Sequence, residues 1–168
     1  KRKTKNQQIK TKARKTLRKK IPIKKQQYVV DTSAIINKFL PKLIKKGLKG
    51  NLIIPNAVMA ELENLANKGK EEGFVGLEEV AKLHNYKKQG IKVHFQGTRP
   101  NEMQIRYAKS GEIDALVRNI AKNNKAILIT ADLVQAKSAQ AYGLNVIFLR
   151  PKHKPQIKKK GFLSFLKR

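Results

Sequence analysis

Short apolar runs and stripes of apolar residues with helical spacing alternate along the middle of this 168-residue chain. The runs are rich in β-branched residues and predict strands at 28–30, 52–54, 91–95, 126–129 and 145–149. The stripes between them predict helices over 34–40, 55–69, 70–88, 98–108, 110–120 and 131–142. Strands that alternate with helices indicate βαβ crossovers, and therefore a mostly parallel sheet with helices on both faces.

Several residues have the chemistry of helix boundaries. Asp31 follows the first predicted strand and can act as an N-cap. Ser110 and Thr130 are predicted to cap the helices that follow them. Gly73 and Gly76 interrupt the helical pattern of 70–88.

The charge of the chain is strongly positive and unevenly distributed. It has 39 Lys+Arg against 11 Asp+Glu, and residues 1–25 and 150–168 carry no acid. We therefore predict a basic, disordered tail over 1–26, a folded domain over 27–149 and a basic tail over 150–168. Such tails bind nucleic acid of any sequence by releasing counterions. The basic residues expected to do so are Lys1, Arg2, Lys3, Arg14, Arg18, Lys19 and Lys20.

The composition also excludes several classes of protein. There is no cysteine, which excludes disulfides and cysteine-ligated zinc. No apolar run approaches the ~20 residues of a membrane span, and no apolar stretch follows the basic N-terminus as in a signal peptide. We expect a cytoplasmic protein with a single folded domain.

The only three aspartates, Asp31, Asp114 and Asp132, are all predicted at one edge of the sheet. Each stands just after a strand or in the first turn of a helix, and helices that follow parallel strands begin at the carboxyl edge. Helical spacing places Glu61 beside the apolar stripe of its helix, whereas Glu63 lies on the opposite side. Four carboxylates from four elements are therefore expected to converge.

Each acid also has a structural explanation. Asp31 could be an N-cap only, Asp114 and Asp132 could be first-turn acids favoured by the helix dipole, and Glu61 could contact a lysine. Taken together, four acids at one edge are more typical of a site for Mg²⁺ or Mn²⁺, which prefer oxygen ligands. A metal site in a basic protein indicates a nuclease.

Other polar side chains near this edge are candidates for supporting roles. Ser33 and Thr130 could orient the metal ligands or waters, or could be helix caps only. Arg99, Arg106 and Lys109 could contact phosphate groups, although a solvated surface explains them equally well.

Four segments resemble the successive motifs of PIN-domain nucleases: 28–36, 55–63, 111–115 and 128–132. The resemblance covers about 27–149, and 58–77 is especially similar to the PIN module of archaeal proteins that join it to an ATPase and a KH domain. No P-loop occurs here, so ATP-driven activity does not carry over. The chain is either a stand-alone relative or lacks the ATPase. Its basic extension is also similar to that of rRNA-processing members.

The resemblance implies a three-layer α/β/α fold with a five-stranded parallel sheet in the order 3-2-1-4-5. It also implies Mg²⁺- or Mn²⁺-dependent hydrolysis of single-stranded RNA, which could be rRNA. Asp31, Glu61, Asp114 and Asp132 match the acidic positions of the family, and Glu112 is a candidate auxiliary.

Two other functions remain open at this point. The chain could be a nonenzymatic RNA-binding or ribosome-associated protein that uses a PIN scaffold and basic tails. It could also be a toxin-type nuclease held by an inhibitory protein partner. A homodimer or a higher oligomer is compatible with either function.

Overall fold

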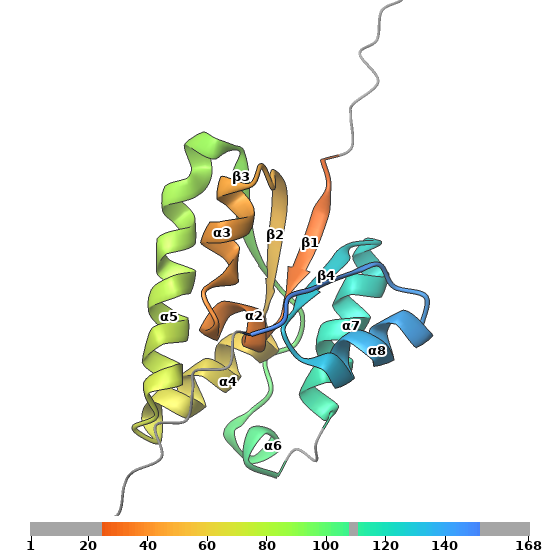
Figure 1. Ribbon diagram of the computed structural model, residues 1–168. Helices are drawn as coiled ribbons and strands as arrows, with labels where there is room; N and C mark the ends of the chain where they lie inside the picture. The colour runs from red at the N-terminus through yellow and green to blue at the C-terminus, as the bar shows by residue number, and fades with distance from the viewer. Residues whose placement is uncertain (1–24, 108–110, 152–168) are drawn as a thin grey trace, which may run out of the picture.

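The computed structural model describes residues 25–107 and 111–151 of the chain (Figure 1). The expectations for both basic tails fall largely outside these residues, as do those for Lys109 and Ser110. The five strands are β1 (Gln27–Val30), β2 (Gly50–Pro55), β3 (Ile91–Gln96), β4 (Ile127–Thr130) and β5 (Val146–Phe148). They form one parallel sheet in the order β3-β2-β1-β4-β5, which confirms the predicted topology.

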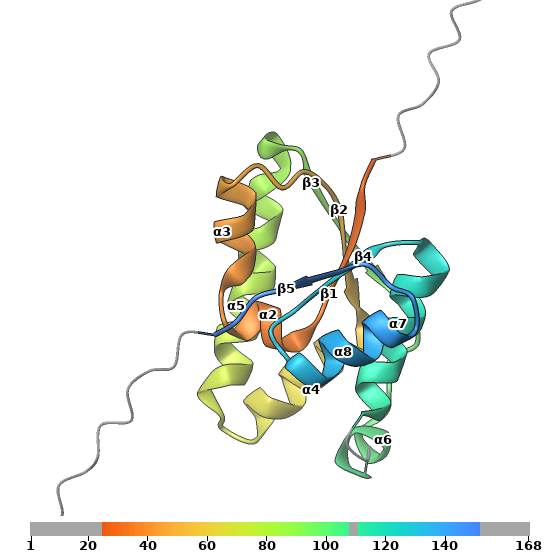
Figure 2. The same ribbon diagram turned by 45° about the vertical axis from the view of Figure 1, so that its right-hand side comes forward.

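Helices cover both faces of this sheet. They are α2 (Thr32–Ile36), α3 (Phe39–Lys45), α4 (Asn56–Asn67), α5 (Glu71–Leu83), the 3₁₀ helix η1 (His84–Gln89), α6 (Glu102–Tyr107), α7 (Glu112–Asn124) and α8 (Leu133–Ala141). Figures 1 and 2 show α3 and α5 on one side of the sheet, and α7 and α8 on the other. The crossovers on either side of β1 therefore run in opposite directions, and β1 and β4 meet where the order reverses.

The hydrophobic core lies on both faces of the three central strands. Fully buried side chains come from β1, β2 and β4, and the helices add buried apolar residues to each face. This is why these strands are continuous apolar runs rather than alternating ones. The fully buried apolar residues of the three strands are Val29, Val30, Leu52, Ile54, Leu128 and Ile129.

The two glycines that interrupt the helical pattern lie inside a continuous α5. A Cβ at Gly73 would overlap the backbone of Ala66, and one at Gly76 would overlap the side chain of Leu62. Both neighbours belong to α4. The glycines therefore allow α4 and α5 to pack closely, and they do not break the helix.

The predicted helix over 34–40 is in fact two helices. Lys38 adopts a left-handed conformation with φ 54°, which separates α2 from α3. Pro41 then stands in the first turn of α3, where its missing N–H costs no hydrogen bond. The predicted helix over 70–88 likewise changes to a 3₁₀ helix at His84.

Gly111, with φ 100°, is the N-cap of α7, and the expected cap, Ser110, lies outside the described residues. The cap predicted at Thr130 is wrong. Asp132 is the N-cap of α8, whereas Thr130 is the last residue of β4. Within 25–107 and 111–151, no helix combines the length and apolar composition that crossing a membrane requires.

Candidate active site

Asp31 is the most buried of the predicted site acids. It directly follows β1, its backbone N–H donates to Ile129 of β4, and its side chain is 5% exposed. Its Oδ2 accepts hydrogen bonds from Ser33 Oγ at 2.6 Å and Thr130 Oγ1 at 2.7 Å. Ser33 in turn accepts from the backbone N–H of Ala131. These contacts tie the ends of β1 and β4 to one carboxylate.

Glu61 approaches Asp31 from the helix that follows β2. Its Oε2 accepts a hydrogen bond of 2.5 Å from Thr32 Oγ1, and Thr32 itself is buried. Burial raises the pKa of Glu61, the Thr32 hydrogen bond lowers it, and the negative charges of Asp31 and Asp114 raise it further. The net effect is a raised pKa, as expected for an acid held among other acids.

Asp114 lies in the first turn of α7 and is partly buried. Burial raises its pKa most, followed by repulsion from Asp31 and Asp132, and the positive charge of Arg118 lowers it. Gln135 fixes this region, since its fully buried amide donates to the carbonyl of Asp114 and accepts from Arg118 at 2.5 Å.

Asp132 is exposed and has a structural role in addition to its place at this edge. Its Oδ1 accepts from the backbone N–H groups of Val134 and Gln135, which is ordinary N-capping of α8. Its own backbone N–H donates to Thr130 Oγ1. Thr130 therefore links Asp132 to Asp31 through one hydroxyl group.

The four acids form one connected electrostatic group. Asp31 and Asp114 raise the pKa of Glu61, and Asp31 and Asp132 raise that of Asp114. Each acid keeps at least one carboxylate oxygen that accepts no hydrogen bond from a described residue. Free oxygens on mutually repelling carboxylates suit a hard divalent cation.

The spacing of these acids limits how such a cation could be held. Among residues 25–107 and 111–151, no three Asp, Glu or His side chains are grouped closely enough to bind one metal ion together. Mg²⁺ usually takes one or two carboxylates and keeps several waters. The donor set therefore fits a largely hydrated ion, and does not fit an ion enclosed by protein ligands.

The other predicted site residues lie outside this group. Glu112 is exposed in the first turn of α7. Arg99 forms an ion pair with Glu63, so its guanidinium is already engaged. Arg106 is exposed on α6, which Figure 1 places at the same end of the sheet as α4.

Sequence reasoning did not single out Thr32, Arg118 or Gln135. Arg118 stands four residues after Asp114 on α7, a spacing that brings side chains together, so this neighbour could have been found. Nothing in the pattern around Gln135 indicates that a polar side chain there is fully buried.

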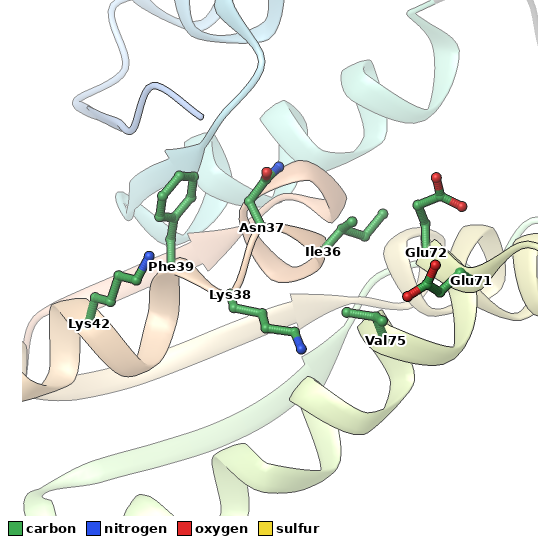
Figure 3. A pocket seen from close by; sticks show the side chains of 8 residues that line it. All are labelled: Ile36, Asn37, Lys38, Phe39, Lys42, Glu71, Glu72 and Val75. Carbon is green, nitrogen blue, oxygen red and sulfur yellow. The ribbon is translucent and has the colours of Figure 1, made fainter. Parts of the chain in front are cut away.

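A hollow of about 530 Å³ lies among α2, α3 and α5 (Figure 3). It is bordered by the end of α2, the start of α3 and the first turns of α5, and none of the four acids lines it. The acids thus occupy the edge of the sheet and do not line this hollow. The lining residues are Ile36, Asn37, Lys38, Phe39, Lys42, Glu71, Glu72 and Val75.

Comparisons with known proteins agree with this fold. An uncharacterized KH and PIN-domain containing protein of Methanocaldococcus jannaschii is 45% identical over 123 residues, which are 71% of this chain and 19% of that protein. The Holliday junction branch migration ATPase PINA of Sulfolobus acidocaldarius is 22% identical over 72% of this chain and 22% of its own length. The chain thus spans about a fifth of these relatives.

One solved structure is similar to this chain over nearly the whole length of the solved domain. It is a domain of a functionally unknown protein from Methanocaldococcus jannaschii, with a TM-score of 0.71 and 40% identity, and the match covers 77% of this chain and 94% of that domain. Residues 28–147 match the PIN domain family, whose members are generally nucleases that use divalent metals. The sheet order, the acidic edge and these matches together show that the chain belongs to the PIN-domain family.

Proposed function

We propose that this protein is a divalent-metal-dependent endoribonuclease that hydrolyses phosphodiester bonds of single-stranded RNA, with Mg²⁺ or Mn²⁺ at the acidic edge. One observation carries the proposal: four acids from four separate elements lie at the edge where β1 and β4 end, and their negative charges help to raise the pKa of Glu61 and of Asp114. Such repulsion costs stability, and a bound cation removes that cost.

In this proposal Asp31 and Asp114 bind the ion directly, and Glu61 and Asp132 bind it directly or through waters. A bound divalent ion supplies an activated water and a positive charge opposite the scissile phosphate. Thr32, with Ser33 and Thr130, holds the carboxylates in place by donating to Glu61 and Asp31.

The choice of RNA rests on charge and on the family. A net charge of +28 favours a polyanionic substrate, and Arg106 is exposed on α6, which lies at the same end of the sheet as α4. RNA processing is the biological role that we infer, with rRNA as one candidate substrate. The cytoplasm is the compartment that we infer.

The test is cleavage of a labelled single-stranded RNA with Mn²⁺, with Mg²⁺ and with EDTA. Asp114→Asn removes one carboxylate of the group and keeps its shape. Glu102→Gln is the matched control, because Glu102 is an exposed first-turn acid of α6. We expect metal-dependent cutting by the wild type and the control, and none by Asp114→Asn. Equal cutting by Asp114→Asn would remove Asp114 from the active site.

A nonenzymatic RNA-binding protein, ribosome-associated or not, is the second candidate. The observation that favours it is that no three acids are grouped to bind one ion in the described residues. Tight RNA binding without cutting, under all three metal conditions, would support this candidate.

A further inference from the structure

The edge of the sheet opposite the acids is built from short connections that precede the five strands. These connections contain several lysines and no aspartate or glutamate in the described residues. Figure 1 shows the start of β1 and the connections before β2 and β3 together at the upper end of the strands. The connections are 25–26, 46–49, 84–90, 125–126 and 142–145.

Four lysines at this edge surround two adjoining hollows. Lys45, Lys49 and Lys88 line a hollow of about 520 Å³, and Lys25 and Lys49 line one of about 210 Å³. Both hollows share Lys49 and Gly90. The stem of Lys49 lies over Gly90, where an added Cβ would be 3.6 Å from its Cγ. We call these four lysines and Gly90 the amino-edge surface.

Among the described residues, no acid forms an ion pair with this surface. Within 25–107 and 111–151, ion pairs join Lys82 and Arg99 to glutamates, and none involves a lysine of the amino-edge surface. All four of its lysines are exposed. Like charges that share a hollow repel one another, and an anionic ligand would relieve this repulsion.

Helix dipoles explain only part of this arrangement. Lys45 and Lys88 stand in the last turns of α3 and η1, where a positive charge is favoured. Lys25 and Lys49 precede strands β1 and β2 and gain nothing from a helix end. Their presence beside Lys45 and Lys88 therefore needs another reason.

We propose that the amino-edge surface binds the phosphodiester backbone of a nucleic acid, separately from the acidic edge. Several exposed lysines around a hollow match successive phosphates, which are read as charge and without sequence preference. The large exposed apolar side chains of the described residues are Phe74, Phe95, Met103, Tyr107, Leu133, Val134 and Tyr142, and none of them lines these hollows. A lipid surface would need such side chains for insertion.

The amino-edge surface extends the proposed function without depending on cleavage. The six residues of β2 span about 20 Å at ~3.3 Å per residue, so the two edges are about that far apart. Only a nucleic acid longer than this can contact both edges. The surface would then raise affinity for long substrates and leave the chemistry of cutting unchanged.

The test is binding of the full chain to a labelled single-stranded RNA in EDTA over a range of NaCl concentrations. The variant is Lys45→Gln with Lys49→Gln and Lys88→Gln. The control carries the same loss of charge elsewhere, as Lys68→Gln with Lys70→Gln and Lys137→Gln, which are also exposed. Thermal unfolding of each variant shows whether the fold is kept.

We expect the amino-edge variant to bind at least about tenfold more weakly than the control, with a salt slope smaller by about 2 for three lost phosphate contacts. If the proposed nuclease activity is found, its KM should rise with kcat unchanged. Equal losses in both triple variants, or no loss in either, would overturn the proposal. Binding to phosphatidylcholine vesicles that contain phosphatidylserine is measured in parallel. The proposal would also be overturned if the amino-edge variant lost affinity for these vesicles and kept its affinity for RNA. Because EDTA prevents cutting, failure of the proposed nuclease function would not alter this result.

Discussion

Thr130 is the side chain whose removal tests most directly how Asp31 is held. Its buried hydroxyl donates to Asp31 Oδ2 at 2.7 Å and accepts from the backbone N–H of Asp132 at 3.0 Å. Ser33 also donates to Oδ2, and its contact of 3.1 Å with Thr130 adds nothing, since both hydroxyl protons already point to Asp31. Thr130→Val keeps the shape and the β-branch and removes these two hydrogen bonds.

A hydrogen bond to a charged group contributes about 1.5–3 kcal/mol. In Thr130→Val, Asp31 loses the hydrogen bond from Thr130 and keeps the one from Ser33. We therefore expect Thr130→Val to lower the free energy of unfolding by about 2 kcal/mol, or about 30-fold in the unfolding constant. With an m-value of about 2 kcal/mol/M, the urea midpoint should fall by about 1 M.

Urea unfolding followed by circular dichroism measures this change. Thr98→Val is the matched control, because Thr98 is exposed and should lose less than about 0.5 kcal/mol. An unchanged midpoint for Thr130→Val, or one equal to that of the control, would refute the role of this hydroxyl in holding Asp31.

Three further predictions concern stability and titration. The pKa of Asp114 is raised in the folded protein, so its favourable contribution to stability is complete below the unfolded pKa near 3.8 and is lost as the pH rises through the folded pKa. At neutral pH the ionised carboxylate therefore destabilises the fold, and Asp114→Asn should be more stable than the wild type. Urea unfolding at several pH values measures this difference. Thr32→Val removes the hydrogen bond that lowers the pKa of Glu61, so carboxyl-carbon NMR titration should give a higher pKa, and an unchanged value would contradict the contact. Gly73→Ala should cost about 1–3 kcal/mol by overpacking against Ala66, and unaltered thermal unfolding would contradict the close packing of α4 and α5.

The sequence predicted the type and order of nearly all elements, because each buried strand is a short apolar run and each helix has an apolar stripe. It missed the break between α2 and α3, where a lysine adopts a conformation usually taken by glycine. Pro41 was the available signal, since proline is accommodated in a first turn and not in a helix interior.

The site was predicted less completely than the fold. The expected convergence of Asp31, Glu61 and Asp114 depends only on topology and helical spacing, and the charges of these acids do act on one another in the structure. The hydrogen-bonding roles of Thr32 and Gln135 depend on side-chain contacts between elements far apart in the chain. Periodicity carries no information about such contacts, so these roles required the structure.

The four acids lie at one end of the sheet and the lysines of the amino-edge surface at the other, and this has a consequence for how a nucleic acid would approach. At the carboxyl edge, Asp31, Glu61 and Asp114 repel phosphate as well as one another. At the amino edge, Lys45, Lys49 and their neighbours attract phosphate. If both proposals hold, the amino edge binds RNA with or without a divalent ion, whereas the acidic edge accepts RNA only after an ion has neutralised it. Affinity at the acidic edge should then depend on the divalent metal, and affinity at the amino edge only on salt.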